Sequence, residues 1–394
     1  MIQPAFMVGV TGTNGKTSVT QWIAQALTAC GRKCAIVGTL GNGFPGALVP
    51  GPNTTPGAHV LREFLPESVR QGAVACAMEV SSIGLHQNRV AGLRFDVAVF
   101  TNLTRDHLEY HGTMAAYAAE KAKLFDWPGL KHAVLNLDDP FGRELAAKLA
   151  GRVPTIGYTL GNEGGCDRVL AATDLTESGS GLAFTLDGVA ISAPVIGRFN
   201  AANLLAVTGT LLAAGLTLPT IAAALAQIVA PPGRMQPVGG GPLDPLVIVD
   251  YAHSPDALEK VLTALRGTAN ARGGKLICVF GCGGERDPGK RPQMGAIAER
   301  LADRVVVTSD NPRGEEPRAI IDQIVAGMQT TPTIEADRAA AIHAAIAAAD
   351  VHDVILLAGK GHEPYQEIAG VRIPYSDVDT AKSALARRHE ERAC

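Results

Sequence analysis

The chain has 394 residues, of which 46% are hydrophobic and 19% are charged, and its formal net charge is −3 at pH 7. This length suits two or three domains with ample core, and the composition argues against disorder. The small negative charge predicts neither nucleic-acid binding nor attraction to an anionic membrane. No apolar run approaches the roughly 18 residues of a membrane span, and no signal-type segment opens the sequence. Seven cysteines, an odd number, indicate reduced thiols and a cytoplasmic location.

The first recognisable feature is a glycine loop between a strand and a helix. An apolar run over 6–10 predicts a buried strand, and 19–29 predicts a helix with an apolar face. Glycines let backbone N–H groups approach phosphates, the helix N-terminus adds positive potential, and Lys16 can reach the terminal phosphates. Thr17 is placed to bind Mg²⁺ through its hydroxyl. The predicted phosphate-binding residues are Gly12, Thr13, Asn14, Gly15, Lys16, Thr17 and Ser18.

The spacing of this loop is unusual. A standard Walker A motif needs glycine at the position of Val10, so the loop has the pattern G-x-x-G-K-T instead. The surrounding strand and helix favour phosphate binding over a chance turn. A hydride-transfer fold is excluded because no G-x-G-x-x-G follows the first strand. The segment T-G-T-N-G-K-T resembles the loop of the Mur ligase superfamily, which includes the folylpolyglutamate synthases.

Alternating strands and helices continue after the loop, and polar residues follow the strand ends. We expect strands over 33–40, 73–80, 95–102 and 131–137 and helices over 58–71 and 117–124. Glu79 closes an apolar run, and the carboxyl end of a buried parallel strand is where open α/β sheets bind ligands. With Thr17, Glu79 would form a Mg²⁺ site of oxygen ligands. His107 follows another strand end that faces the same crevice.

Two stretches of the first domain depart from this rhythm. Residues 41–58, rich in glycine, proline, asparagine and threonine, predict a loop. Over 151–195, short alternating runs predict a small antiparallel patch at the edge of the first domain. Two apolar helices follow at 201–215 and 218–229, and the segment 230–235 indicates a domain junction. The resemblance to Mur-type ligases, which are expected to close a hinge on substrate binding, makes 230–234 the candidate hinge.

The α/β rhythm restarts in the second half of the chain. We expect strands over 246–249, 275–281, 304–309 and 354–358 and helices over 255–266, 293–302 and 317–328, with Ser254 as an N-cap. Each of these strands ends in a polar cluster, as a binding crevice at the carboxyl edge of a sheet requires. The predicted fold class is therefore α/β. A P-loop-type, mostly parallel domain over 1–232 is followed by a Rossmann-like α/β domain over 233–394.

Motifs along nearly the whole chain resemble those of the UDP-N-acetylmuramoyl-tripeptide synthetases, a branch of the Mur ligase family. These enzymes add the third residue of the peptidoglycan stem peptide. The number and order of the motifs exclude coincidence. They are TGTNGKTS (11–18), NTTP (53–56), EVSS (79–82), HQNR (86–89), TNLTRDHLEYHG (101–112), YAAEK (117–121), GRFNAAN (197–203), PPGRM (231–235), DYAHSPDAL (250–258), GCGGERDPGKRP (281–292), DNPR (310–313) and GKGHEPYQ (359–366).

The resemblance implies an ATP site and two metal ions. Lys16 and the loop amides would hold the β- and γ-phosphates of ATP, and Thr17 and Glu79 would bind one Mg²⁺. His107 would bind a second ion together with Lys121, which matches the family's carbamylated lysine, although its helical context alone predicts a solvated charge. Lys16, Glu79, His107 and Lys121 would thus be the catalytic residues. Further contacts to ATP would come from Asn203, Arg234, Asp250 and His253.

The same resemblance implies the substrates. ATP would phosphorylate the terminal carboxylate of UDP-MurNAc-L-Ala-D-Glu, and the amine of meso-diaminopimelate would attack the acyl phosphate. DNPR resembles the motif of enzymes that use diaminopimelate. Arg313 can hold a distal carboxylate by two hydrogen bonds, while Asp310 and Glu363 can accept from a distal ammonium. Lysine has no distal carboxylate and would leave Arg313 unpaired. The muramyl peptide would contact Asn53, Thr54, Thr55, Ser81, Gln87 and Arg89, and the amino acid would contact Arg286, Asp310, Asn311, Pro312, Arg313, Gly359 and Glu363.

One departure from the family concerns its N-terminal domain, which holds the uridine diphosphate end of the nucleotide substrate. Here the phosphate-loop strand begins close to Met1, so we expect that domain to be missing. One alternative is a folylpolyglutamate synthase, against which Thr17 and DNPR argue. Another is a non-catalytic ligase fragment, against which the retained metal ligands argue. We expect a monomer that acts in peptidoglycan synthesis, and hence in cell wall biogenesis, cell shape and cell division.

Overall fold

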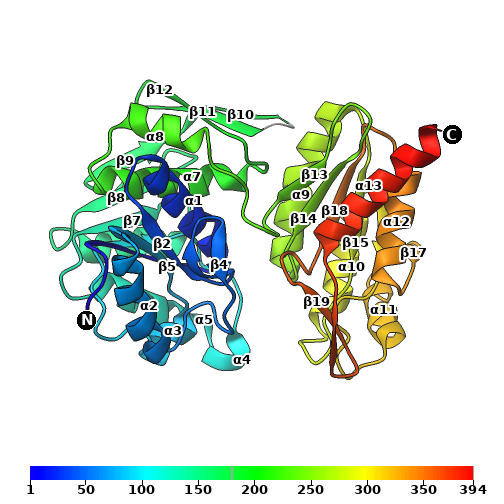
Figure 1. The fold of residues 1–394 in the computed structure, drawn as a ribbon, viewed down its shortest axis with the longest axis horizontal. Helices are drawn as coiled ribbons and strands as arrows, with labels where there is room; N and C mark the ends of the chain where they lie inside the picture. The colour runs from blue at the N-terminus through cyan, green and yellow to red at the C-terminus, as the bar shows by residue number, and fades with distance from the viewer. Residues whose placement is uncertain (179–180, 394) are drawn as a thin grey trace. The chain divides into compact units, whose positions relative to one another are not determined.

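Residues 1–178 and 181–393 are described in the computed structural model of the chain. They form two compact units, of which the first contains Met1–Thr176 and Gly181–Val229 and the second consists mainly of residues from Ala230 onward (Figure 1). Each unit is built on its own large sheet. Within the described ranges there is no helix with the length and apolar character that crossing a membrane would require.

The first unit is organised around a nine-stranded sheet. The strands are β1 (Phe6–Thr11), β2 (Cys34–Gly38), β3 (Gly41–Phe44), β4 (Ala47–Val49), β5 (Ala75–Glu79), β6 (Val97–Phe100), β7 (His132–Asn136), β8 (Thr155–Thr159) and β9 (Arg168–Ala171). Their order is β4-β3-β2-β5-β1-β6-β7-β8-β9, and every neighbouring pair from β2 to β9 is parallel. Because β1 lies between β5 and β6, the carboxyl ends of these three strands meet at one edge.

Helices cover both faces of this sheet because its central strands are apolar on both sides. They are α1 (Lys16–Ala29), α2 (Ala58–Arg70), α3 (Ser82–His86), α4 (Leu108–His111), α5 (Met114–Ala122), the 3₁₀ helix η1 (Lys123–Asp126), α6 (Pro140–Leu149), α7 (Phe199–Ala213) and α8 (Leu218–Leu225). One core cluster joins Val8 and Val10 to Trp22 of α1 and to α7, and the other joins Met7 to Leu61 of α2. α7 is buried along most of its length, which its apolar sequence permits.

The prediction of a plain loop over 41–58 was wrong. The segment contains β3 and β4, which form an antiparallel hairpin beside β2. Gly41 has a φ of 126°, and a Cβ there would lie 2.3 Å from the carbonyl oxygen of Val49. Glycine therefore serves close strand approach here rather than a turn. Glycine content alone does not distinguish the two uses.

The predicted antiparallel patch over 151–195 was wrong in its first half. β8 and β9 continue the parallel sheet, and antiparallel pairing begins only in a separate three-stranded sheet. That sheet consists of β10 (Thr173–Ser178), β11 (Gly181–Leu186) and β12 (Val189–Ala193). No helix lies between β8 and β9. The sequence therefore lacks the strand–helix alternation that indicates parallel strands.

The second unit has a six-stranded sheet of order β13-β14-β18-β15-β16-β17. All pairs are parallel except β13–β14, so the carboxyl ends of β14, β18, β15 and β16 lie side by side at one edge. The elements are β13 (Gln236–Gly239), β14 (Leu246–Asp250), α9 (Pro255–Arg272), β15 (Leu276–Phe280), α10 (Lys290–Leu301), β16 (Arg304–Val307), α11 (Pro317–Val325), β17 (Thr333–Ile334), α12 (Arg338–Ala348), β18 (Val354–Ala358), β19 (Tyr365–Ile368), β20 (Val371–Pro374) and α13 (Asp377–Ala393).

Both large sheets are mostly parallel and carry helices, which confirms the predicted α/β fold class with a P-loop-type unit followed by a Rossmann-like unit. The Ser254 cap is present, since its Oγ accepts from the backbone N–H of Ala257 at 3.4 Å. The sequence analysis did not predict α12, α13 or the hairpin of β19 and β20.

Candidate active site

The phosphate loop joins β1 to α1 at the carboxyl edge of the first sheet. Gly12 has a φ of 143° and Gly15 a φ of 85°, a backbone region that favours glycine. A Cβ at Gly12 would lie 1.9 Å from Thr101 Oγ1, so a larger residue does not fit against the end of β6. Lys16 begins α1, and its Nζ donates to the carbonyl oxygens of Gly12 at 2.9 Å and Thr13 at 2.8 Å. The loop therefore curls around the Lys16 side chain at a helix N-terminus, which suits phosphate binding.

The segment after β6 supports this loop from the side. Asn102 Oδ1 accepts from the backbone N–H of Asn14 at 2.9 Å, and Thr101 Oγ1 donates to the carbonyl oxygen of Asn14 at 2.6 Å. The backbone N–H of Thr13 donates to the carbonyl oxygen of Asn102 at 2.7 Å. Sequence reasoning identified Thr13 and Asn14 but missed Thr101 and Asn102, which hold them in place.

Glu79 closes β5 and is buried, with 1% of its surface exposed. Its Oε2 accepts from Oγ1 of Thr17 and from Oγ1 of Thr39, each at 3.0 Å, and its Oε1 accepts from the backbone N–H of Thr39 at 2.8 Å. The structure thus brings the predicted partners Thr17 and Glu79 together. Thr39, which follows β2, was missed because a single threonine after a strand carries no distinguishing signal. A carboxylate beside a hydroxyl is a donor set that fits Mg²⁺.

Lys121 lies on α5 and is 1% exposed. Its Nζ donates to the carbonyl oxygen of Gly12 at 2.9 Å and lies 4.2 Å from the centre of the Tyr117 ring. Burial, with a further contribution from the nearby Lys16 cation, holds the pKa of Lys121 well below its ordinary value, against the opposing effect of Asp106. The position is therefore not the solvated one that its helical context suggests. A neutral amine is the form that can react with carbon dioxide to give a carbamate.

His107 precedes α4 and has a φ of 53°, an uncommon value for a residue with a side chain. Its Nε2 lies 3.5 Å from Asp106 Oδ2, and its Nδ1 lies 3.5 Å from Glu109 Oε1. The His107 ring centre is 6.3 Å from that of Tyr117, which also contacts Lys121. Among the described residues no group of three or more His, Cys, Asp and Glu side chains is arranged to hold a metal. A second ion on His107 and Lys121 therefore stays a prediction.

The loop that precedes α2 and the segment that follows β5 meet next to Glu79. Thr55 Oγ1 donates to the carbonyl oxygen of Glu79 at 3.0 Å and accepts from the backbone N–H of Ser81 at 2.9 Å. Arg89 donates to the carbonyl oxygen of Thr55 at 2.7 Å and twice to Gln87 Oε1, at 2.9 and 2.6 Å. Asn53 is exposed. Six residues were predicted for the muramyl peptide, and hydrogen bonds join five of them to this region. Thr54 is joined through Thr39, and the others are Thr55, Ser81, Gln87 and Arg89.

Asn203 on α7 contacts the phosphate loop. A Cβ at Gly15 would lie 2.6 Å from Asn203 Oδ1, so the amide oxygen lies against the residue that precedes α1. Asn203 Nδ2 donates to Asn200 Oδ1 at 2.8 Å, and Asn200 Nδ2 donates to the carbonyl oxygen of Ile196 at 2.7 Å. Asn200 thereby orients the predicted ATP contact Asn203, a role that sequence reasoning did not assign.

In the second unit, Asp250 closes β14 and is buried. Its carboxylate accepts from two backbone N–H groups, one of them that of Met235 at 2.7 Å. Burial raises the pKa of Asp250, and the nearby Arg234 cation opposes this. The Arg234 guanidinium lies 4.6 Å from the centre of the Tyr251 ring, and the exposed His253 ring lies 4.6 Å from it as well. The structure therefore gathers these three predicted ATP contacts at the end of β14.

The loops after β15, β16 and β18 meet at the same edge of the second sheet. Arg313 Nη1 donates to the carbonyl oxygen of Gly284 at 2.6 Å. This is the one hydrogen bond of that guanidinium within the described part of the chain, so its other N–H groups are available. A Cβ at Gly359 would lie 2.4 Å from Asp310 Oδ2, which explains the glycine. The carboxylate of Asp310 thus lies against the loop after β18.

The remaining residues predicted for the amino acid lie in these loops. Asn311 Nδ2 donates to Glu363 Oε2 at 2.8 Å, which joins the loop after β16 to the loop after β18. Arg286 is exposed, and both it and Arg313 lie next to Gly283, where a Cβ would be 3.7 Å from Arg286 Cγ and 2.9 Å from Arg313 Nη1. The structure therefore places Arg286, Asp310, Asn311, Pro312, Arg313, Gly359 and Glu363 along one sheet edge.

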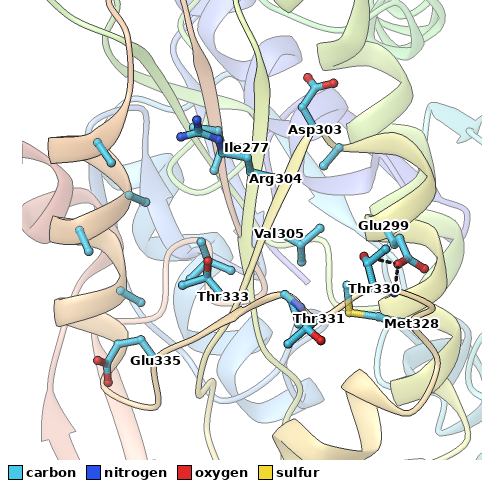
Figure 2. Close-up of a pocket in the computed structure, with 17 residues that line it drawn as sticks. Ile277, Glu299, Asp303, Arg304, Val305, Met328, Thr330, Thr331, Thr333 and Glu335 are labelled. Atoms are coloured by element: carbon cyan, nitrogen blue, oxygen red, sulfur yellow. Dashed lines mark hydrogen bonds between the residues drawn. The ribbon is translucent and has the colours of Figure 1, made fainter.

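A cavity of about 440 Å³ also lies in the second unit, between β16 and α12 (Figure 2). Its wall includes the second residue of β15, Ile277, and the first two residues of β16, Arg304 and Val305. The cavity is therefore beside the amino-terminal part of these strands, whereas the loops described above follow their carboxyl ends. None of the predicted site residues lines it.

Comparison with known proteins assigns the family. Residues 10–211 match the Mur ligase middle domain, and residues 233–361 match the Mur ligase, glutamate ligase domain. The chain belongs to the Mur ligase family. Members of this family are ATP-dependent ligases, and this chain is accordingly an enzyme of that type.

Two similar curated proteins are both named UDP-N-acetylmuramoyl-L-alanyl-D-glutamate--2,6-diaminopimelate ligase. The protein of Chromobacterium violaceum is 54% identical over 384 residues, which cover 96% of this chain and 77% of the relative. The protein of Pseudomonas aeruginosa is 54% identical over 391 residues, which cover 96% of this chain and 78% of the relative. These relatives confirm the branch of the family that the motifs indicated.

Solved structures agree with this assignment. A structure of a UDP-N-acetylmuramoyl-L-alanyl-D-glutamate--2,6-diaminopimelate ligase is 39% identical, has a TM-score of 0.72, and covers 98% of this chain and 80% of its own. A Mycobacterium tuberculosis folylpolyglutamate synthase has a TM-score of 0.68 at 20% identity, and the match covers 98% of this chain and 90% of that chain. The second likeness shows a shared fold alone.

Proposed function

We propose that this enzyme joins meso-diaminopimelate to UDP-MurNAc-L-Ala-D-Glu in an ATP-dependent step of peptidoglycan synthesis. The observation that carries the proposal is Arg313, whose guanidinium has one hydrogen bond within the described residues and keeps its other N–H groups for a carboxylate. Relatives whose names specify 2,6-diaminopimelate share more than half of their aligned residues with this chain. The ATP-binding domain comprises residues 1–232 and the amino-acid-binding domain residues 233–394, in a cytoplasmic monomer.

The phosphates of ATP bind in the loop from Gly12 to Ser18, where backbone N–H groups and Lys16 hold them. Thr17 and Glu79 fit Mg²⁺, which supplies charge neutralisation for the transferring phosphoryl group when bound. A second ion would be held by His107 and the carbamate of Lys121. The other contacts to ATP come from Asn203, Arg234, Asp250 and His253.

The reaction is an amide ligation through an acyl phosphate. The terminal carboxylate of the dipeptide attacks the γ-phosphorus of ATP, the bond to the bridging oxygen breaks, and ADP leaves. The amine of diaminopimelate then attacks the acyl carbon and loses a proton. The bond between the acyl carbon and the phosphate oxygen breaks, and inorganic phosphate leaves with the electron pair of that bond. Lys16 balances negative charge on the phosphate oxygens throughout. Thr55, Ser81, Gln87 and Arg89 hold the muramyl peptide.

The amino-acid site selects diaminopimelate by pairing both of its ends. Arg313 binds the distal carboxylate, and the acceptors Asp310 and Glu363 bind ammonium. Lysine would leave the Arg313 guanidinium without that carboxylate, and an unmet charged group costs on the order of 1–3 kcal/mol, or about 5- to 150-fold in binding. Discrimination therefore comes from an unpaired cation as much as from a gained contact.

The test is release of ADP by the purified chain with ATP, Mg²⁺, UDP-MurNAc-L-Ala-D-Glu and either meso-diaminopimelate or L-lysine. We expect kcat/KM for diaminopimelate to exceed that for lysine by about 100-fold, since a site built for a polar group strongly rejects an analogue that lacks it. Reactions without the nucleotide substrate are the control. Equal values for the two amino acids would contradict the role of Arg313, and no turnover with either at high nucleotide-substrate concentration would contradict the ligase function.

A further inference from the structure

Lys360 is a buried cation in the amino-acid site to which sequence reasoning gave no role. It follows Gly359 at the end of β18, and its side chain is 0% exposed. Its Nζ donates to Asn311 Oδ1 at 2.8 Å and to Glu363 Oε2 at 3.0 Å. Both partners belong to the diaminopimelate pocket of the proposed function.

The side chain of Asn311 is the point where three segments meet. Its Oδ1 accepts from Lys360 Nζ and from the backbone N–H of Glu367 at 3.0 Å, and its Nδ2 donates to Glu363 Oε2 at 2.8 Å. The amide therefore has one orientation, with oxygen toward two donors and nitrogen toward a carboxylate. Without Lys360, Asn311 Oδ1 would keep one hydrogen-bond donor, the backbone N–H of Glu367. Glu363 Oε2 would also keep one donor, Asn311 Nδ2.

The charges explain why a cation occupies this position. The Glu363 side chain is only 20% exposed, and a carboxylate withdrawn from water needs a partner. Lys360 and Asn311 both bind Oε2, which leaves Oε1 with no hydrogen bond from any described residue. Glu363 Oε1 is therefore the atom that can accept from a substrate ammonium, and Lys360 determines which way it points.

Strand β19 extends the same frame to Arg313. Arg313 has a φ of 51°, a left-handed conformation that costs a residue with a side chain about 1–2 kcal/mol. Its backbone N–H donates to the carbonyl oxygen of Glu367 at 2.9 Å, and its carbonyl oxygen accepts from the backbone N–H of Ala369 at 2.6 Å. The backbone N–H of Glu367 binds Asn311 Oδ1, so β19 holds the DNPR loop at both Asn311 and Arg313.

We propose that Lys360 is a positioning residue for the amino-acid substrate. Through Asn311 and Glu363 it sets the acceptor for the substrate ammonium and the loop that carries Arg313. The identity of that substrate as diaminopimelate rests on the proposed function, whereas the positioning role rests on the contacts of Lys360.

The first test is Lys360→Met, which removes the cation and keeps the side-chain length. We expect the KM for meso-diaminopimelate to rise about 10- to 100-fold, the range for a lost hydrogen bond to a charged group, with the KM for ATP within about twofold. The matched control is Lys382→Met, at an exposed lysine of α13, which should leave both values unchanged. An unchanged KM for diaminopimelate would overturn the proposal, and so would equal increases in both KM values, which indicate general damage.

A double-mutant cycle separates positioning from packing. If Lys360 acts through Glu363, the variant with both Lys360→Met and Glu363→Gln should lose no more kcat/KM for diaminopimelate than the worse single variant. Additive losses would overturn the proposal. Should Lys360→Met lack the circular dichroism of the folded chain, the same cycle uses Lys360→Arg, which keeps the charge but changes the geometry. An unchanged KM for diaminopimelate in that variant would again overturn it.

Failure of the proposed substrate has a different signature. If the wild-type chain turns over L-lysine instead of diaminopimelate, the proposed function is wrong in its amino acid, and the Lys360 variants are measured with lysine. A raised KM for lysine at an unchanged KM for ATP would then still support positioning of an ammonium group. No change in the KM for lysine would overturn it.

Discussion

The phosphate-loop site of the first unit and the amino-acid loops of the second unit hold their buried charged residues in opposite ways. In the first, Glu79 accepts hydrogen bonds from neutral groups of Thr17 and Thr39, and Lys121 donates to the carbonyl oxygen of Gly12 and lies over an aromatic ring. Neither Glu79 nor Lys121 forms an ion pair with a residue in the described ranges. Both groups are thus placed by dipoles rather than by counter-charges.

The amino-acid loops of the second unit use ion pairs. Arg338 and Asp377 have side chains that are 0% exposed and joined at 2.7 Å, and Arg338 also donates to the carbonyl oxygens of Ser309 and Ala358. Ser309 and Ala358 immediately precede the loops at Asp310 and Gly359. The Arg338–Asp377 pair therefore fixes the starting points of two binding loops. The other buried cations of this edge are Lys360, paired with Glu363, and Arg291, paired with Glu315.

The difference follows from the proposed role of each site. A carboxylate that is to bind a metal ion, or an amine that is to react with carbon dioxide, must not have a fixed counter-charge, because an ion pair would compete with that step. A site that recognises the shape of an amino acid needs charges that stay in place. At these two sites, the residues without a counter-charge lie where chemistry is proposed, and the paired charges lie where the geometry of the amino-acid loops is maintained.

The largest expected effect is on stability, in the second unit. Arg338→Met should lower the free energy of unfolding by about 3–5 kcal/mol, because it strands the buried Asp377 carboxylate. Glu79→Gln should cost less than about 1 kcal/mol, because no counter-charge is stranded. Urea unfolding measures both, with the exposed Arg318→Met as the control. Equal costs at Arg338 and Glu79 would break the comparison.

The second effect is on catalysis, in the first unit. Lys121→Ala should lower kcat by about 1,000-fold, equivalent to about 4 kcal/mol, and added short carboxylates should partly restore it by standing in for a carbamate. The control is Lys123→Ala, an exposed lysine paired with Glu120. Full activity of Lys121→Ala would contradict the carbamate role.

A third effect concerns pH. The pKa of Lys121 is lowered in the folded chain, so the unfolded chain binds more protons at this position, and stability rises with pH between the lowered value and about 10.4. Relative to Lys121→Met, the wild-type chain should gain up to about 1.4 kcal/mol per pH unit in that window. Urea unfolding at several pH values in buffer free of carbon dioxide measures this. A difference that does not change with pH would mean that Lys121 is charged when buried.

The smallest effect is expected at Thr39. Thr39→Val removes one hydroxyl that donates to Glu79 Oε2 but keeps the backbone hydrogen bond to Oε1. We expect kcat to fall about 5- to 10-fold, the value of one net hydrogen bond. Thr28→Val, at a hydroxyl that accepts from the backbone N–H of Cys34 at 3.2 Å, is the control for ATP turnover. An effect of Thr39→Val as large as that of Lys121→Ala would show that Glu79 depends on this one hydroxyl.

Sequence reasoning located the residues that bring charge to strand ends, because Lys16, Glu79 and Arg313 interrupt apolar runs or form rare motifs. It missed residues that act through neutral hydrogen bonds. Thr39 is a common residue type after a strand, and only its partner Glu79, which lies 40 residues away in the sequence, reveals its role. Support of this kind is a property of tertiary contacts rather than of local pattern.

The fold shows the same division. Continuous apolar strands such as β14 and β18 were predicted within a residue or two, because full burial leaves few alternatives. The edge strands β3 and β4 were not, since glycine there reflects close approach to a neighbouring strand. α12 is alanine-rich, so it lacks the strong apolar periodicity that would have indicated a helix.

The central position of β1 has a consequence for how the chain folds. β1 precedes both of its neighbours in the sequence, because they are β5 and β6, with Phe6 paired to Ala75 and Val8 paired to Val97. On the ribosome neither side of β1 can close until those strands have emerged, and pairing between such distant residues slows folding. The phosphate loop is therefore synthesised before the two strands that flank β1 but completed only after them, and folding intermediates that lack β6 should be unable to bind ATP.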